Sequence, residues 1–182
     1  FIDKKTVLLH GITSSGKTEL YIHLIEQTLA EKKQVLYLVP EIALTTQLTS
    51  RLKRIFGNKL AVYHSRFSDA ERVEIWNNML QDKGYEVVIG ARSAVFIPFR
   101  QLGLVIVDEE HETSYKQFDP APRYNARNAA IVLASLHGSK TLLGSATPAI
   151  ESSFNAKTGK SGYVSIHQRF RALEFSDILI AD

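Results

Sequence analysis

The chain has 182 residues, 45% of them hydrophobic, and a formal net charge of +3. This length and composition allow a sizeable core and are most simply those of one globular domain. The absence of cysteine excludes disulfides and thiolate zinc ligation within these residues. No apolar run reaches the roughly 18 residues of a membrane span, and the first five residues lack the layout of a signal peptide. We therefore expect a cytoplasmic protein without a membrane partner.

The two ends of the chain predict that it is a domain excised from a longer protein. It starts without methionine, and its last six residues stop inside an apolar segment. The small positive charge permits a polyanionic partner without requiring one.

Six short apolar runs predict strands, and amphipathic stretches separate most of them. The runs are Val7–Leu9, Val35–Val39, Leu60–Tyr63, Val87–Ile89, Leu104–Val107 and Thr141–Leu143. Such alternation predicts a parallel sheet, and near-continuous apolar strands indicate that helices cover both of its faces. The predicted fold is a doubly wound α/β fold with its ligand at the carboxyl ends of the strands.

The first predicted strand runs into a glycine-bounded loop. Its residues are Gly11, Ile12, Thr13, Ser14, Ser15, Gly16, Lys17 and Thr18. The two glycines let backbone N–H groups converge on phosphate oxygens, and the helix that follows presents its positive end to the same anion. Lys17 is expected to reach the β- and γ-phosphates, and the Thr18 hydroxyl to ligate Mg²⁺. The sequence therefore predicts an ATP-binding loop.

Two further helices have signals of their own. Apolar residues recur at helical spacing at Leu44, Leu48, Leu52 and Ile55. Ser68 and Glu71 form a capping box that opens the next helix. Val73, Trp76 and Leu80 of that helix are expected to face the core, so we interpret Trp76 as a packing residue.

The fifth predicted strand ends in acidic residues. Asp108 and Glu109 follow a buried strand, which places them at the sheet edge that also carries the phosphate loop. Asp108 is expected to hold Mg²⁺ through its water shell, while Glu109 orients and deprotonates the attacking water. Lys17, Asp108 and Glu109 are therefore the candidate catalytic residues.

A long connection, residues 113–124, follows these acids. It interleaves aromatic residues with basic ones, at Tyr115, Lys116, Phe118, Arg123 and Tyr124. This combination can stack bases while neutralising phosphates. A loop held in place by buried aromatic side chains explains the same pattern equally well.

Three more segments lie at strand ends. In residues 144–148, Ser145 and Thr147 can cap the helix that Pro148 opens, and their hydroxyls can also relay the nucleotide state. We group them with His111 as candidate coupling residues. Residues 39–45 and 90–94 carry Pro40, Thr45, Arg92 and Ser93, which are candidate contacts to a DNA backbone.

The six histidines show no metal-ligand spacing. Apart from His111, they are expected to be ordinary surface or hydrogen-bonded residues: His10, His23, His64, His137 and His167.

The motifs are more specific as an ordered set. Segments 11–18, 40–45, 90–94, 108–111 and 144–148 resemble helicase motifs I, Ia, Ib, II and III of superfamily 2. The sequences of three of these segments, Val-Pro-Glu-Ile-Ala-Leu-Thr, Asp-Glu-Glu-His and Gly-Ser-Ala-Thr-Pro, resemble those of the PriA family of bacterial primosomal helicases. The resemblance extends over nearly the whole chain.

This resemblance implies that residues 1–182 are the first RecA-like lobe of an ATP-driven DNA helicase. Such a helicase moves 3′ to 5′, remodels stalled forks and helps to reload the replicative helicase. ATP and Mg²⁺ are the implied cofactors, with zinc only in a part of the parent protein outside this chain. The implied partners are single-stranded and forked DNA, the single-strand-binding protein and other primosome components. The aromatic-rich loop is implied to link DNA contact to ATP hydrolysis.

Two other functions use the same phosphate-loop scaffold. A nucleoside or small-molecule kinase would explain Lys17, Thr18 and Asp108, but it would not need Glu109 and would want a mobile basic lid. A module that senses nucleotide without hydrolysis would not need the intact pair of acids.

Overall fold

The computed structural model describes residues 3–63, 68–81 and 84–168, and within these ranges seven strands form a single sheet. The sheet order is β3-β4-β2-β5-β6-β1-β7, and every neighbouring pair is parallel. The strands are β1 (Thr6–Gly11), β2 (Gln34–Leu38), β3 (Leu60–Tyr63), β4 (Val87–Gly90), β5 (Leu102–Val107), β6 (Lys140–Ser145) and β7 (Gly162–Ile166). The predicted parallel sheet is confirmed.

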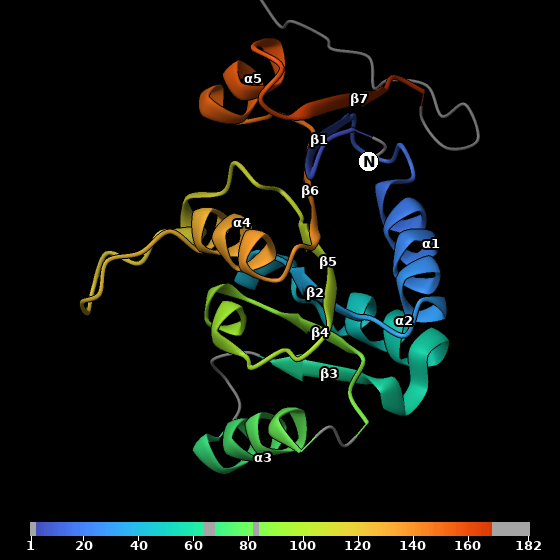
Figure 1. The fold of residues 1–182 in the computed structure, drawn as a ribbon, viewed down its shortest axis with the longest axis vertical. Coiled ribbons are helices and arrows are strands. Elements are labelled where there is room, and N and C mark those ends of the chain that lie inside the picture. Colours follow the sequence, from blue (N-terminus) through green and yellow to red (C-terminus); the bar gives the residue numbers. More distant parts are fainter. Residues whose placement is uncertain (1–2, 64–67, 82–83, 169–182) are drawn as a thin grey trace, which may run out of the picture.

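Hydrophobic clusters lie on both faces of the sheet, because successive strand side chains point in opposite directions. Leu36 and Leu38 belong to one cluster, whereas Val35 and Tyr37 belong to the other. Helices α3 (Asp69–Leu80) and α4 (Ala126–Leu136) cover the first face, and α1 (Lys17–Ala30) and α2 (Thr46–Phe56) cover the second (Figure 1). The doubly wound architecture is therefore confirmed. Helix α5 (Ile150–Lys157) packs beside β1.

The face that α3 presents to the core differs from the prediction. Ile75 and Met79 are buried, whereas Val73, Trp76 and Leu80 are 55%, 39% and 46% exposed. Both the buried and the exposed set have helical spacing, so spacing alone does not show which of them packs against the sheet. The capping box is confirmed, with Glu71 N donating to Ser68 Oγ at 3.3 Å and Ser68 N donating to Glu71 Oε2 at 2.8 Å.

The buried face of α2 also differs by one position. Leu52 and Phe56 point into the core, and Ile55 is 40% exposed. Thr45 caps this helix, because its hydroxyl accepts a hydrogen bond from Leu48 N at 3.2 Å.

The seventh strand, β7, was not predicted. It pairs with β1 as the outermost strand of the sheet, and its residues Tyr163 and Val164 are about half exposed. An edge strand with one covered face lacks the continuous apolar run that marked the central strands.

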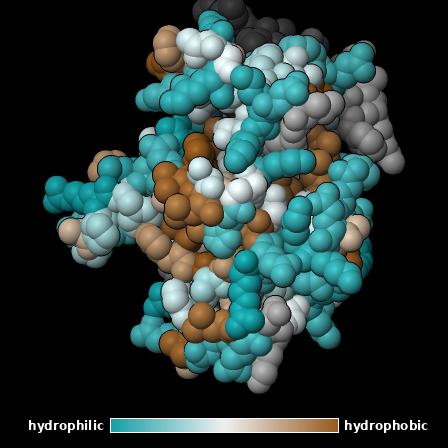
Figure 2. Space-filling view, in the orientation of Figure 1, coloured by the Kyte–Doolittle hydropathy of each residue, from teal (hydrophilic) through white to brown (hydrophobic). Residues whose placement is uncertain are grey.

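Helix α4 packs closely on the sheet through small residues. Ala126, Ala130 and Ala134 are buried, and Ile131 and Leu133 pack partly buried against the same core, whereas Val132 and Leu136 are exposed. An apolar area lies over α4 in the space-filling view (Figure 2). Across the described ranges no helix combines the length and apolarity that crossing a membrane requires.

Candidate nucleotide site

The phosphate loop joins β1 to α1 at the carboxyl edge of the sheet. Gly16 is the N-cap residue of α1 with a φ of 85°, a left-handed conformation that favours glycine, and no side chain caps this helix end. The first-turn N–H groups of α1 have no partner within the helix, and such groups are suited to bind an anion. The Lys17 side chain is buried, and its ammonium donates to the Gly11 carbonyl at 2.8 Å.

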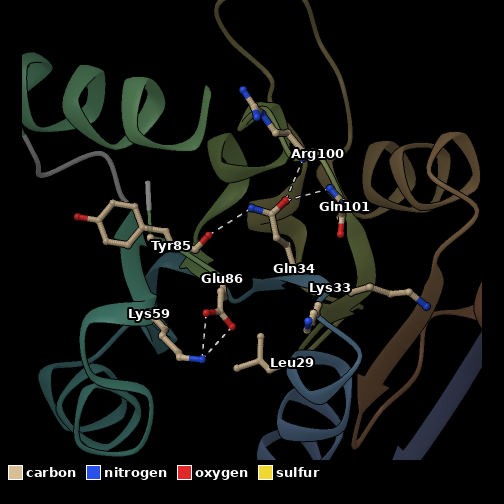
Figure 3. A pocket seen from close by; sticks show the side chains of 10 residues that line it. Leu29, Lys33, Gln34, Lys59, Tyr85, Glu86, Arg100 and Gln101 are labelled. Carbon is tan, nitrogen blue, oxygen red and sulfur yellow. Dashed lines mark hydrogen bonds and ion pairs between the residues drawn. The ribbon is translucent and has the colours of Figure 1, made fainter. Parts of the chain in front are cut away.

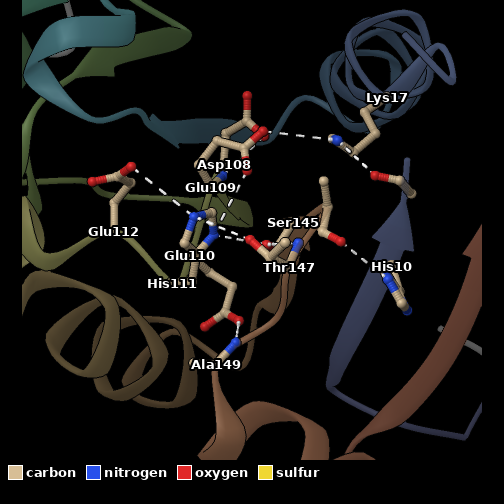
Figure 4. Close-up of polar contacts among 12 residues, drawn as sticks. His10, Lys17, Asp108, Glu109, Glu110, His111, Glu112, Ser145, Thr147 and Ala149 are labelled. Carbon is tan, nitrogen blue, oxygen red and sulfur yellow. Dashed lines mark hydrogen bonds and ion pairs between the residues drawn. The ribbon is translucent and has the colours of Figure 1, made fainter. Parts of the chain in front are cut away.

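The acidic motif meets this loop across one intervening strand. β5 and β1 flank β6, and Glu109 Oε1 lies 3.7 Å from Lys17 Nζ (Figure 4). Glu109 is a non-glycine residue with a φ of 44°, and its N–H donates to Asp108 Oδ1 at 3.0 Å. Such left-handed backbone costs energy and is concentrated at functional sites. The tertiary structure thus brings together the three candidate catalytic residues.

Three tyrosines hold Asp108, and none was predicted for this site. The Tyr21 hydroxyl donates to Oδ1 at 2.9 Å, and the Tyr37 hydroxyl donates to Oδ2 at 3.3 Å. Tyr115 donates instead to the Asp108 main-chain carbonyl at 2.6 Å. Burial and the neighbouring Glu109 raise the pKa of Asp108, whereas the Tyr21 hydrogen bond lowers it. Burial, followed by the Asp108 charge, raises the pKa of both Tyr21 and Tyr37, so both remain protonated donors.

The candidate coupling residues form a continuous polar chain beside Glu109. His111 Nδ1 lies 3.7 Å from Glu109 Oε2 and shares a 2.8 Å hydrogen bond with Ser145 Oγ. Its Nε2 lies 3.3 Å from the Thr147 hydroxyl. The imidazole therefore connects the acidic motif to the segment that follows β6 (Figure 4).

The expected capping of α5 by Ser145 and Thr147 is wrong. Ser145 Oγ accepts a hydrogen bond from Thr147 N, and the N-cap residue of α5 is Ala149 without a side-chain cap. Glu110 supplies the missing acceptor, since Ala149 N donates to its Oε1 at 2.8 Å. A cap contributed from 39 positions away has no local sequence signal.

The connection after the acids divides into a buried base and an exposed tip. Tyr115 is only 1% exposed, so packing rather than base stacking explains it. Phe118 is 68% exposed and Arg123 is exposed, in the arm that projects away from the sheet (Figure 1). Lys116 Nζ donates to the Arg123 carbonyl at 2.9 Å, and Tyr124 packs edge-on against Phe96.

The remaining candidate DNA contacts lie near the same edge of the sheet. Pro40 is buried, and its carbonyl accepts the Ala43 N–H at 2.9 Å. Arg92 donates to the Lys116 carbonyl at 3.1 Å and thereby supports the base of the loop. Thr45 is exposed, and Ser93 is partly exposed.

The other histidines mostly fit the prediction. His23 bonds Gln27 at 3.0 Å, His137 ends α4 and His167 is exposed, whereas His64 lies outside the described residues. His10 is more involved than expected, because its Nε2 bonds the Ala146 carbonyl at 3.1 Å within the coupling segment.

A pocket of about 500 Å³ lies at the amino ends of the strands, opposite the carboxyl ends that carry the phosphate loop. Lys59, Glu86, Arg100 and Gln34 are among its lining residues, near the amino ends of β2, β4 and β5 (Figure 3). Lys59 pairs with Glu86 at 3.0 Å, and Gln34 Oε1 accepts the Arg100 N–H at 2.9 Å. This pocket is separate from the phosphate loop and the acids.

The donor set at the carboxyl edge fits Mg·ATP. The uncapped start of α1 and the Lys17 ammonium suit phosphate, and the Ser15 hydroxyl is buried with no hydrogen-bond partner in the described part of the chain. No group of three His, Cys, Asp or Glu side chains gathers as a metal site among the described residues. Mg²⁺ does not require one, since it is commonly held by one or two carboxylates, waters and substrate phosphates.

A parallel α/β sheet with a phosphate loop after β1 and paired acids after β5 defines the class of phosphate-loop nucleoside triphosphatases. The family model of DEAD/DEAH box helicases matches residues 1–154, and the chain belongs to this family. This membership does not favour the kinase alternative.

Curated relatives are the replication restart proteins PriA. The chain is 44% identical to that of Bacillus subtilis (strain 168) over 180 residues, which cover 99% of this chain and 22% of the relative. It is 51% identical to that of Synechocystis sp. over 147 residues, or 80% of this chain and 17% of the relative. The chain therefore spans about a fifth of the length of these relatives.

Solved helicases share the fold. The DUF1998 helicase MrfA bound to DNA and AMPPNP aligns over 91% of this chain and 25% of its own, with a TM-score of 0.63 and 21% identity. The Hef helicase domain of Pyrococcus furiosus aligns over 91% of this chain and 36% of its own, with a TM-score of 0.61 and 17% identity. The predicted RecA-like fold class is confirmed.

Proposed function

We propose that residues 1–182 are one RecA-like lobe of a DNA helicase, the ATP-binding motor lobe of a protein that moves 3′ to 5′ and acts in replication restart. The observation that carries the proposal is the 3.7 Å approach of Lys17 to Glu109 beside Asp108. This approach supports the assignment of a phosphate-binding cation, a metal-binding acid and a general base to one sheet edge. The names and sequences of the PriA relatives support the replication-restart role.

Each residue has a separate task in this proposal. The loop from Gly11 to Thr18 binds the phosphates, and Thr18 and Asp108 would hold Mg²⁺, which supplies charge neutralisation when bound. Glu109 orients and deprotonates the attacking water. Its 33% side-chain exposure leaves it accessible to that water, whereas the Lys17 side chain is only 10% exposed.

Two more sets of residues extend from the site. His111, Ser145 and Thr147 would sense the position of Glu109 and pass it to the segment before α5. Single-stranded DNA would contact the accessible residues of the strand-end segments, Thr45, Arg92 and Ser93, and the loop with Lys116, Phe118, Arg123 and Tyr124. Pro40 is buried and would shape its segment without touching the strand. Basic and aromatic groups are the usual means of holding a single strand.

The resemblance to the PriA relatives supports a wider proposal about partners and location. We infer a bacterial cytoplasmic protein that works on forked DNA with the single-strand-binding protein and other primosome components. Zinc would belong to a part of the parent protein outside these residues.

ATP hydrolysis by the natural-length protein, measured with and without single-stranded DNA, tests the proposed function. We expect stimulation by DNA. A rate independent of DNA, together with phosphate transfer to a nucleoside acceptor, would reopen the kinase alternative. Binding of ATP without turnover would favour a nucleotide-sensing module.

A further inference from the structure

The contacts of Asp108 point to residues that none of the sequence motifs contains. Tyr21 and Tyr37 are both 0% exposed, and both direct their hydroxyls to the carboxylate of this acid. A buried tyrosine hydroxyl needs a hydrogen-bond partner, and a carboxylate accepts a stronger hydrogen bond than a neutral group does.

We propose that Tyr21 and Tyr37 are positioning residues that fix the orientation of the Asp108 carboxylate for the metal ion of the ATP site. This inference rests on the proposed role of Asp108. The two hydroxyls arrive on different oxygens, at 2.9 Å on Oδ1 and 3.3 Å on Oδ2. Two donors on two oxygens restrict rotation about the bond that carries the carboxylate.

The two tyrosines reach Asp108 from different elements on the same face of the sheet. Tyr37 belongs to β2, the neighbour of β5 in the sheet, and pairs with Ile106 two positions before the acid. Tyr21 belongs to α1, one helical turn after Lys17 and Thr18. Their rings make an edge contact, with centroids 5.6 Å apart and an interplanar angle of 72°. The helix that carries Lys17 is thereby connected directly to the acid that follows β5.

Gly144 makes the Tyr21 contact possible. It lies on β6, which separates β1 from β5 in the sheet. A Cβ atom at this position would overlap the Tyr21 hydroxyl and approach Asp108 Oδ1 to 3.5 Å. The absence of a side chain on this strand therefore leaves room for the hydroxyl to reach the acid.

Tyr115 provides a matched control. It is also buried and donates to the same residue, but to the main-chain carbonyl rather than to the carboxylate. Tyr115→Phe removes one hydroxyl from the same core and leaves both carboxylate contacts in place. If Tyr21→Phe lowers metal affinity more than this control does, the additional loss is due to the lost orientation of the carboxylate.

Mn²⁺ is the probe, because its binding can be followed by electron paramagnetic resonance without turnover. Binding is measured in the natural-length protein with a non-hydrolysable ATP analogue. We expect Tyr21→Phe to weaken Mn²⁺ affinity about tenfold, the low end of losses caused by removing a residue that orients a metal ligand. Tyr37→Phe should have a smaller effect because its hydrogen bond is longer, and Tyr115→Phe should have the smallest effect because its hydroxyl does not contact the carboxylate.

A double-mutant cycle gives a second test. Gly144→Ala should weaken Mn²⁺ binding in the parent sequence but less so in Tyr21→Phe, where the displaced hydroxyl is already absent. Additive losses would contradict the steric connection between these two positions.

The outcomes separate this inference from the proposed function. If Asp108→Asn weakens Mn²⁺ binding but neither tyrosine variant does, the positioning role is overturned and the metal role of Asp108 stands. If Asp108→Asn has no effect, the proposed function fails first. Equal losses in Tyr21→Phe and Tyr115→Phe, accompanied by equal drops in thermal stability, would indicate general core packing and overturn the positioning role.

Discussion

Lys17 Nζ lies 3.7 Å from Glu109 Oε1, which joins the phosphate loop after β1 to the acidic motif after β5. The Lys17 side chain is 10% exposed and that of Glu109 is 33% exposed, so the pair is only partly open to solvent. Charges in such a setting act on a bound phosphate more strongly than fully exposed ones do.

Lys17→Ala should weaken the binding of Mg·ATP to the natural-length protein. It removes a charge-assisted contact worth about 1.5–3 kcal/mol, or roughly ten- to a hundredfold in affinity. Calorimetric titration measures this change, and Lys32→Ala, an exposed lysine at the end of α1, is the control. Equal affinity in the Lys17 variant and the parent would contradict the phosphate-loop assignment.

Substitutions of the two acids should separate metal binding from water activation. Glu109→Gln should keep Mg·ATP bound while nearly abolishing turnover, because only the base is lost. Asp108→Asn should weaken metal binding as well. The readout is the Mg²⁺ dependence of nucleotide binding and of hydrolysis, and the same Mg²⁺ dependence in both variants would reverse the two roles.

The exposed tip of the loop should affect DNA contact and not folding. Phe118→Ala should lower DNA affinity by about five- to a hundredfold, as expected for a lost base stack, and should spare the DNA-independent ATPase rate. Tyr115→Ala is the contrast, because removing a large buried aromatic side chain costs about 3–5 kcal/mol of stability. A Phe118 variant with lower thermal stability and unchanged DNA stimulation would favour packing for this position too.

Glu110 should be a structural residue that holds α5. Its side chain is fully buried and accepts hydrogen bonds from Arg127 at 2.9 Å, Ser152 at 2.8 Å and the Ala149 N–H. Glu110→Ala would leave the Arg127 guanidinium without its partner, at a cost of about 3–5 kcal/mol. We expect much faster hydrogen exchange of the α5 amides.

Glu112→Ala is the matched control for Glu110. That carboxylate is 40% exposed and lies 4.0 Å from His111, so its loss should change stability by less than about 0.5 kcal/mol. Similar exchange rates in both variants would contradict the assignment of Glu110 to α5.

Residues 1–182 alone should hydrolyse ATP negligibly and unwind nothing. An arginine finger supplies about 10³–10⁵ in rate. Two local arginines are already engaged, Arg92 with the Lys116 carbonyl and Arg127 with Glu110. Steady-state ATPase of these residues beside the natural-length protein measures the difference. Comparable turnover would show that the site is complete within one lobe.

The sequence by itself determined most of the sheet and the candidate site residues. The phosphate loop has a local signature, and the apolar runs identified six of the seven described strands. Because parallel strands end at a common edge, two motifs far apart in the chain can be placed together from their positions after strands alone. The meeting of Lys17 with Glu109 follows from this rule.

Only the tertiary structure decided which side chains surround that site. The Tyr21 hydroxyl meets an acid 87 positions away, through a gap that Gly144 leaves on a third element. The buried face of α3 and the cap of α5 also depend on which surface packs against each helix. Helical spacing and capping signals are local, whereas these contacts are set by strand order and by the space between layers, which no short stretch of sequence specifies.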